Sequence, residues 1–352
     1  MLQYRAPRWL AGHGPVAGNV QTIWPALYSA THHEGSRLPV HYRRERWDAP
    51  DGDFVDVDFH PAEPRVSAAS PAGALGGGAS LGAAQAARPL LVLFHGLEGS
   101  SQSHYARAFA HWAHAQGWDY AVPHFRGCSG EVNRRPRAYH SGDHEEVDWI
   151  LHRLCAGHAG PVLAVGVSLG GNVLLRWAQE QGAEAARRVR AVVAISSPID
   201  LAACGQAIGR GFNRVVYTRM FLSTMRPKAM ERLKLFPGLF DAEAMRRARD
   251  IYDFDQVFTA PLHGFASTED YWARCSAKPG LKAMRDVPAL VLNARNDPFV
   301  PASCLPTSGE VGPAVTLWQP HEGGHVGFPS GRFPGHVADL PQAVGRWLRS
   351  HL

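Results

Sequence analysis

A serine flanked by small residues ends a strongly apolar stretch of the sequence that begins at Pro161. Together with Gly166 and Gly170, Ser168 forms the pattern Gly-x-Ser-x-Gly. A buried strand, a sharp turn at the serine and a helix that starts at once would hold the hydroxyl clear of a sheet. Such a hydroxyl becomes a nucleophile when a histidine takes its proton and a carboxylate orients that histidine. Ser168 is therefore the predicted nucleophile, and its target would be a carbonyl carbon.

The same pattern occurs a second time at Gly78–Gly82, with Ser80 in the central position. That copy lies in an Ala/Gly/Ser tract that has no apolar run before it and no helical signal after it. After Ser168, by contrast, Val173, Leu174 and Trp177 recur at helical spacing. Because the motif works only between a strand and a helix, Ser80 is interpreted as a chance match.

Candidates for the acid and the base follow later apolar runs, in the order serine, acid, histidine. Asp297 ends the loop that follows the run starting at Leu290, and His325 follows a Gly-Gly pair after the last predicted strand. We predict that Asp297 orients the base and that His325 is the general base. Two alternatives stay open: His321 for the base, and Asp200, which follows an earlier strand, for the acid.

Acyl transfer also needs two backbone N–H groups that point at the developing oxyanion. Leu169, at the start of the helix after the serine, is expected to supply one of them. The loop after the apolar run Leu90–Gly96 is expected to supply the other, from Leu97. His95 in that loop is interpreted as a residue that shapes the loop rather than as an acid or a base.

Strands and helices must hold these residues in place, and the hydrophobic pattern of the sequence indicates where they lie. An alternating stretch after Asp51-Gly52 predicts the second strand of an edge hairpin. Short apolar runs then alternate with helical patterns, which indicates an α/β fold with a mainly parallel sheet and helices on both faces. The predicted strands are Phe54–Phe59, Leu90–Gly96, Tyr120–Phe125, Pro161–Val167, Val189–Ser196, Pro288–Asn293 and Ala314–Trp318, and helices are expected around 105–112, 145–154, 173–178 and 341–351.

The alternation of predicted strands and helices stops between residues 201 and 285, where helical patterns rich in Met, Phe and Arg predict an inserted helical cap. Residues 89–200 and 286–352 are assigned to the core, 1–62 to an N-terminal segment with the edge hairpin, and 66–88 to a flexible low-complexity loop. An apolar cluster in the cap is interpreted either as cap core or as an acyl-chain pocket. Its candidate pocket residues are Phe212, Val216, Met220 and Phe221.

Composition narrows the classes of function. The 352 residues are 45% hydrophobic, enough for a large core, and the net charge of +5 is spread along the chain. We therefore expect no nucleic-acid partner, although weak peripheral contact with anionic lipid stays open. Five widely spaced cysteines suggest reduced structural thiols, and neither a signal peptide nor a membrane-spanning run is evident, so a cytoplasmic location is expected. His104, His111 and His114 share a predicted helix but lack a thiolate or carboxylate partner, so no metal or cofactor is expected.

Several motifs spread over nearly the whole chain resemble those of the YheT-like α/β hydrolases, whose relatives include mammalian α/β-hydrolase-domain lipases and yeast medium-chain ester enzymes. The resemblance implies an α/β-hydrolase fold and a carboxylesterase or lipase-like activity that uses the residues already selected. Two departures are Asn296, where the family usually has a second Asp, and the insertion at 66–88. The motifs are Gly18–Ile23, Asp51–Phe54, His95–Gly99, His124–Gly130, Tyr139–Gly142, the Ser168 segment, Asn296–Phe299 and Gly323–Phe328.

The sequence thus predicts a serine hydrolase that cleaves carboxylic esters with short to medium acyl chains through an acyl-enzyme. Its partner would be a small-molecule ester. Acyl transfer to an alcohol would use the same residues, and a non-catalytic binding module of the same fold is the alternative outside enzymes. Pocket shape decides the acyl length and the alcohol group, so the sequence leaves both open, together with the oligomeric state.

Overall fold

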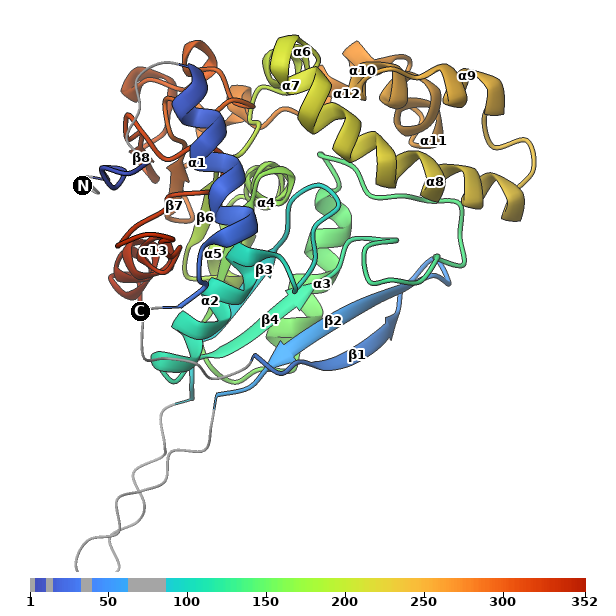
Figure 1. The fold of residues 1–352 in the computed structure, drawn as a ribbon. Coiled ribbons are helices and arrows are strands. Elements are labelled where there is room, and N and C mark those ends of the chain that lie inside the picture. The colour runs from blue at the N-terminus through green and yellow to red at the C-terminus, as the bar shows by residue number, and fades with distance from the viewer. Residues whose placement is uncertain (1–3, 11–14, 33–39, 63–86) are drawn as a thin grey trace, which may run out of the picture.

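A computed structural model describes residues 4–10, 15–32, 40–62 and 87–352 of the chain. Its centre is an eight-stranded sheet in the order β1-β2-β4-β3-β5-β6-β7-β8 (Figure 1). The strand β2 pairs antiparallel with both β1 and β4, and all other neighbours are parallel. The strands are β1 (Arg43–Asp48), β2 (Phe54–His60), β3 (Leu90–Phe94), β4 (Asp119–Pro123), β5 (Val162–Val167), β6 (Val192–Ile195), β7 (Ala289–Leu292) and β8 (Val315–Trp318).

Helices bury both faces of this sheet. On one face, Val92 and Ala164 pack with residues of α3 (His144–Ala156) and α4 (Leu169–Gln181). On the other face, Leu93 and Val165 pack with residues of α2 (His104–Ala115) and α13 (Asp339–Arg349). Because side chains alternate across a strand, a strand covered on both sides must be apolar throughout. This confirms the predicted α/β fold, its mainly parallel sheet and the edge hairpin. The short helix α5 (Ala183–Arg188) follows α4.

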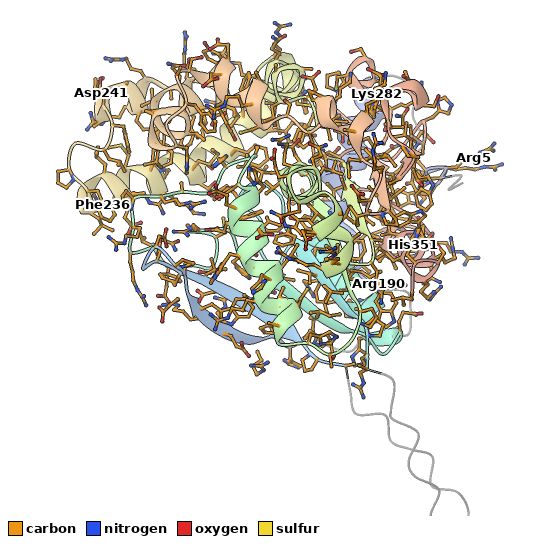
Figure 2. The ribbon with its side chains drawn as sticks, turned by 180° about the vertical axis from the view of Figure 1, so that it is seen from behind. Arg5, Arg190, Phe236, Asp241, Lys282 and His351 are labelled. Carbon is orange, nitrogen blue, oxygen red and sulfur yellow. The ribbon has the colours of Figure 1, made fainter. Side chains whose placement is uncertain are left out.

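A helical region is inserted between β6 and β7, as the sequence predicts, and it lies along the top of the view in Figure 1. We call it the cap. From behind, Phe236 and Asp241 lie at the end of the cap that is remote from Arg5 and His351 (Figure 2). Its elements are α6 (Leu201–Ile208), α7 (Gly211–Asn213), η1 (Arg214–Thr218), α8 (Arg219–Leu235), α9 (Ala242–Arg247), α10 (Ile251–Phe254), η2 (Asp255–Thr259), α11 (Ala260–Leu262), α12 (Thr268–Cys275) and η3 (Lys278–Ala283). After β7, the one-turn helices η4 (Ala302–Cys304) and η5 (Ser308–Glu310) follow.

Besides the short helix α5, the sequence patterns miss the longer helix α1 (Pro15–Tyr28). It contains Gly18 and Pro25, and residues of both types have poor helix propensity. Its stability must therefore come from packing against the rest of the molecule. Most of the predicted low-complexity loop at 66–88, including Ser80, lies outside the described residues. No helix in the described part of the chain has the length and hydropathy needed to cross a bilayer.

Candidate active site

Ser168 occupies a strained turn between β5 and α4. Its backbone has φ 53° and ψ −121°, and α4 begins at the next residue. A Cβ at Gly166 would lie 2.4 Å from the Gly170 carbonyl oxygen, and one at Gly170 would lie 2.4 Å from the Phe94 oxygen. Only glycine allows the strand, the turn and the helix to pack this closely. The strained backbone conformation is thus at Ser168, the proposed nucleophile, at the end of β5.

The fold brings Ser168, His325 and Asp297 into one hydrogen-bonded line. His325 Nε2 lies 3.0 Å from Ser168 Oγ, and His325 Nδ1 lies 2.9 Å from one Asp297 oxygen and 3.2 Å from the other. The Asp297 side chain is fully buried and also accepts from the backbone N–H groups of Phe299 and Val300. Because an ionised carboxylate only accepts, the proton of neutral His325 resides on Nδ1, which leaves Nε2 free to accept from the serine hydroxyl.

The two alternatives from the sequence lie elsewhere. Asp200 caps the N-terminus of α6, where its Oδ1 accepts from the Ala203 backbone N–H at 3.1 Å. His321 is exposed to solvent. Within the described part of the chain, neither residue has a hydrogen bond to Ser168 or to His325. Asp200 instead caps a helix, and His321 lies on the surface.

The helix α1 holds the loop that carries His325, a contact that the chemical motifs did not reveal. Thr22 Oγ1 accepts from the His325 backbone N–H at 2.8 Å and donates to the Gly18 oxygen. Gln21 Oε1 accepts from the Gly323 N–H at 2.9 Å and from Asn296 Nδ2 at 2.8 Å. The only sequence signal for these residues is the family-like motif Gly18–Ile23, whose role the sequence alone leaves unexplained.

Asn296 connects the acid loop with the histidine loop. Its Nδ2 donates to Gln21, and its Oδ1 accepts from the Gly324 N–H at 3.0 Å. An aspartate could accept but could not donate, so the amide suits this position. A Cβ at Gly18 would lie 1.9 Å from the backbone carbonyl oxygen of Asn296, which explains why α1 carries a glycine there.

Leu97 lies in the turn after β3, close to the serine. A Cβ at Gly96 would lie 3.2 Å from the Ser168 Cβ. The Leu97 backbone N–H has no hydrogen-bond partner among the described residues, and Leu169 is the first residue of α4, where N–H groups have no partner within the helix. Burial lowers the pKa of His95 to about 3, so this side chain is neutral. Its ring nitrogens bond the Gly96 oxygen and the Phe125 N–H, which joins the ends of β3 and β4.

The residue after Leu97 is fixed from two sides. Glu98 has a positive φ of 56°, and its backbone N–H donates to the Tyr139 hydroxyl at 3.0 Å. The same hydroxyl donates to Glu98 Oε1 at 2.9 Å, and Lys228 on α8 pairs with Glu98 Oε2 at 2.8 Å. The cap therefore contacts the turn in which the Leu97 N–H lies.

A cavity of about 340 Å³ lies beside Leu97 and Leu169 and extends under the cap. Its apolar wall includes Met225, Phe254 and Phe258. Part of this wall comes from η2, a π-helix, which is a rare form that is frequent at functional sites. Polar and charged side chains also line the cavity, among them Arg126, Cys128, Tyr139, Lys228, Arg232 and Asp255.

The four pocket candidates from the sequence do not line this cavity. Phe212 and Met220 are 54% and 53% exposed, and Phe212 borders a separate hollow beside Asp297. Val216 packs against a cluster around Phe299, and Phe221 packs against that cluster and against the cap core. Of the elements that carry these candidates, only α8 contributes residues to the cavity, and it does so through a different face that includes Met225.

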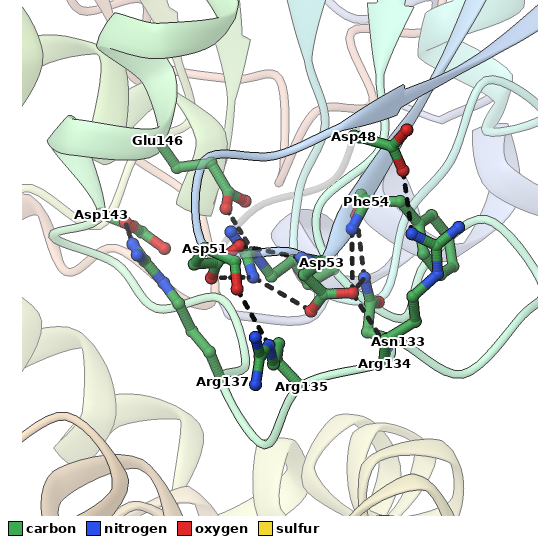
Figure 3. A network of polar contacts seen from close by, with 11 residues as sticks. Asp48, Asp51, Asp53, Phe54, Asn133, Arg134, Arg135, Arg137, Asp143 and Glu146 are labelled. Atoms are coloured by element: carbon green, nitrogen blue, oxygen red, sulfur yellow. Dashed lines mark hydrogen bonds and ion pairs between the residues drawn. The ribbon is translucent and has the colours of Figure 1, made fainter.

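Behind the site, a polar network ties the edge hairpin to α3 (Figure 3). Arg126 Nη1 donates to Asp51 at 2.7 Å and to Asp53 at 3.0 Å, and its Nε pairs with Glu146. Asp53 also accepts from the Asn133 side chain. This network gives a structural role to the motifs Asp51–Phe54 and His124–Gly130, because it holds the loop after β4 in place. Within the described residues, no three His, Cys, Asp or Glu side chains come together as a metal site.

Comparisons with known proteins agree with this architecture. A family model described as the alpha/beta hydrolase fold matches residues 89–331. The chain is 36% identical over 334 residues to the Escherichia coli (strain K12) protein named "Putative esterase YheT", and the match covers 91% of both chains. It is 26% identical to "Phospholipase ABHD3" of Mus musculus over 97% of this chain and 81% of the relative. The solved structure of DcsB with a substrate analogue shares the fold, with a TM-score of 0.54 at 14% identity, over 88% of this chain and 99% of that one.

The fold and the matched family model define an α/β hydrolase. Within that class, the chain belongs to the family of YheT. The resemblance that the sequence motifs suggested is thereby confirmed.

Proposed function

We propose that the chain is a serine hydrolase of carboxylic esters with short to medium acyl chains. Ser168 is the nucleophile, His325 the general base, and Asp297 the residue that orients and stabilises the histidine. The observation that carries this proposal is the line of hydrogen bonds from Asp297 through His325 to Ser168. The names of two relatives, an esterase and a phospholipase, support the same reaction class.

The proposed reaction proceeds in two halves. His325 Nε2 takes the Ser168 proton as Oγ attacks the ester carbonyl, and Asp297 stabilises the imidazolium that forms. The Leu97 and Leu169 N–H groups donate to the oxyanion. His325 then gives its proton to the departing alcohol oxygen, which leaves an acyl-serine. Water attacks this ester with His325 again as the base, the bond between the acyl carbon and Ser168 Oγ breaks, His325 returns the proton to Oγ, and the carboxylic acid is released.

The acyl chain is proposed to enter the cavity beside Leu97 and Leu169. Met225, Phe254 and Phe258 offer it an apolar wall, and the cavity begins at the two residues that would hold the oxyanion. A volume of about 340 Å³ is at the small end of ligand pockets, which favours short and medium chains.

A fluorophosphonate probe tests the nucleophile directly. We expect it to label Ser168 in active protein, because His325 Nε2 lies within hydrogen-bond distance of its hydroxyl. We expect Ser80 to stay unmodified, because its sequence context lacks the strand and helix signals of the motif. The Ser168→Ala protein should lose both the labelling and the hydrolysis of nitrophenyl esters from acetate to palmitate. An adduct mapped to another serine would overturn the assignment.

The same assays test the acid. We expect Asp297→Asn and His325→Ala to lower kcat by roughly 10³- to 10⁵-fold with the fold intact. Asp200→Asn is the matched control, since Asp200 caps α6, and it should leave kcat nearly unchanged. A larger loss in Asp200→Asn than in Asp297→Asn would move the orienting role to Asp200.

A further inference from the structure

Arg232 is a buried cation without a counter-ion. It lies in the last turn of α8, is only 6% exposed, and lines the cavity beside Leu97 and Leu169. Its guanidinium has no hydrogen bond or ion pair with any residue that the structure describes. Burial is the main influence on this group and lowers the pKa of Arg232. A charge removed from water without a partner is costly, so Arg232 is not explained by the stability of the fold alone.

Three other charged side chains that line the cavity have partners within the protein. Arg126 pairs with Asp51, Asp53 and Glu146. Lys228 pairs with Glu98, and the Asp255 carboxylate accepts from Trp272 Nε1 at 2.9 Å.

The carboxylate that most influences Arg232 is already engaged. This group is Asp53, which accepts from the Arg126 and Asn133 side chains and from the Arg134 backbone N–H. Of the three cations Arg126, Lys228 and Arg232, Arg232 is therefore the one that is left for a ligand.

We propose that Arg232 binds an anionic group, a carboxylate or a phosphate, carried by the ester substrate. The planar guanidinium presents donors in a fork that matches either oxyanion. The same cavity supplies an apolar wall from Met225 and Phe258 and begins at Leu97 and Leu169. The inference rests on the proposed function and adds the class of substrate: an amphipathic ester with one negative group.

Matched pairs of esters test this charge preference. For a carboxylate on the acyl chain, mono-4-nitrophenyl suberate is compared with 4-nitrophenyl octanoate. For a phosphate on the alcohol, 1-octanoylglycerol 3-phosphate is compared with 1-octanoylglycerol. In at least one pair, we expect the wild-type protein to favour the anionic ester by about tenfold or more in kcat/KM. The pair that shows the preference identifies the anion.

Arg232→Gln should abolish this preference by lowering kcat/KM for the anionic ester by about tenfold or more relative to the neutral ester, because only the anionic ester makes use of the cation. Arg232→Lys should retain part of the preference. Lys234→Gln is the control, since it removes an exposed positive charge from the same helix turn, and it should keep the preference. An anionic-to-neutral ratio that is equal in wild type and Arg232→Gln, or that Lys234→Gln lowers as much, would overturn the proposal.

Binding to the Ser168→Ala protein separates this inference from the proposed function. We expect calorimetry to show binding of octyl phosphate or monomethyl suberate, and we expect Arg232→Gln in the same background to weaken it by about tenfold or more. That result would support the anion site even if no ester were hydrolysed. Equal binding with and without Arg232 would overturn it even if neutral esters were good substrates.

Discussion

At the scale of single residues, Thr22 shows how the site depends on a side chain that takes no part in the proposed reaction. Its hydroxyl accepts from the His325 backbone N–H and donates to the Gly18 oxygen. The hydroxyl thus fixes the backbone of the histidine that lies 3.0 Å from the serine. A small displacement at this distance lowers the rate steeply, because proton transfer needs aligned partners.

Thr22→Val removes the hydroxyl but preserves the side-chain shape. We expect kcat for 4-nitrophenyl butyrate to fall by roughly 10- to 100-fold with KM little changed, because the histidine loop shifts while the cavity does not. The variant should also lose about 1–3 kcal/mol of unfolding free energy, since the His325 N–H is left without its acceptor. Thr22→Ser restores the hydroxyl and should restore kcat. If Thr22→Ser were as slow as Thr22→Val, a role in positioning His325 would be excluded.

At the scale of elements, α8 carries three features of the cavity on one helix. Met225 is buried in the apolar wall, Lys228 pairs with Glu98 beside the Leu97 turn, and Arg232 supplies the unpartnered cation. Met220, five residues before Met225, points away from this wall and is mostly exposed. The rotation of the helix decides which side chains meet the cavity.

Two methionine substitutions test this orientation. We expect Met225→Ala to change the ratio of kcat/KM between butyrate and octanoate esters by about tenfold or less, since one apolar contact is worth roughly 1–3 kcal/mol at most. Met220→Ala is matched in chemistry and should leave the ratio unchanged. Acetate hydrolysis reports whether both variants are folded. The opposite pattern, with Met220→Ala altering the ratio, would favour the pocket that the sequence suggested.

At the scale of the whole molecule, stability depends on charges buried where the cap meets the core. Burial raises the pKa of Asp255 to about 6, although Trp272 and Thr259 donate hydrogen bonds to it. The folded state therefore holds this proton at pH values at which the unfolded chain has released it. The contribution of Asp255 to stability must therefore fall as the pH rises from about 4 to about 6, and this loss is complete above that range.

Asp255→Asn removes this ionisation. The shift of about two pKa units corresponds to roughly 3 kcal/mol, so the variant should unfold at a higher temperature than wild type at pH 8. At pH 4 the difference should shrink, because the folded wild type is then protonated. Thermal unfolding at both pH values measures this, and Glu243→Gln, at an exposed position of the cap, serves as the control. A difference in Tm that is the same at both pH values would contradict a buried ionisation at Asp255.

Local patterns in the sequence specify the order of the secondary-structure elements and the turn at the serine. Short apolar runs that alternate with helical patterns specified the order of strands and helices, and Gly166, Ser168 and Gly170 specified a sharp turn, because both signals depend on neighbours along the chain. The candidates Asp297 and His325 followed from their places after later strands. The hydrogen bonds that join Asp297, His325 and Ser168 depend on the tertiary fold, since these residues come from separate segments of the sequence.

The surroundings of those residues depend on contacts between segments that are distant in the sequence. The helix α1 has weak local propensity and owes its place to packing against the histidine loop, so no periodic signal marks Thr22 as a contact of His325. The cavity is assembled from the turn after β3, the loop after β4 and the cap. Whether Arg232 is paired depends on where every carboxylate lies in space. The periodicity of the sequence predicts which residues are buried, but it does not predict which of them contact one another.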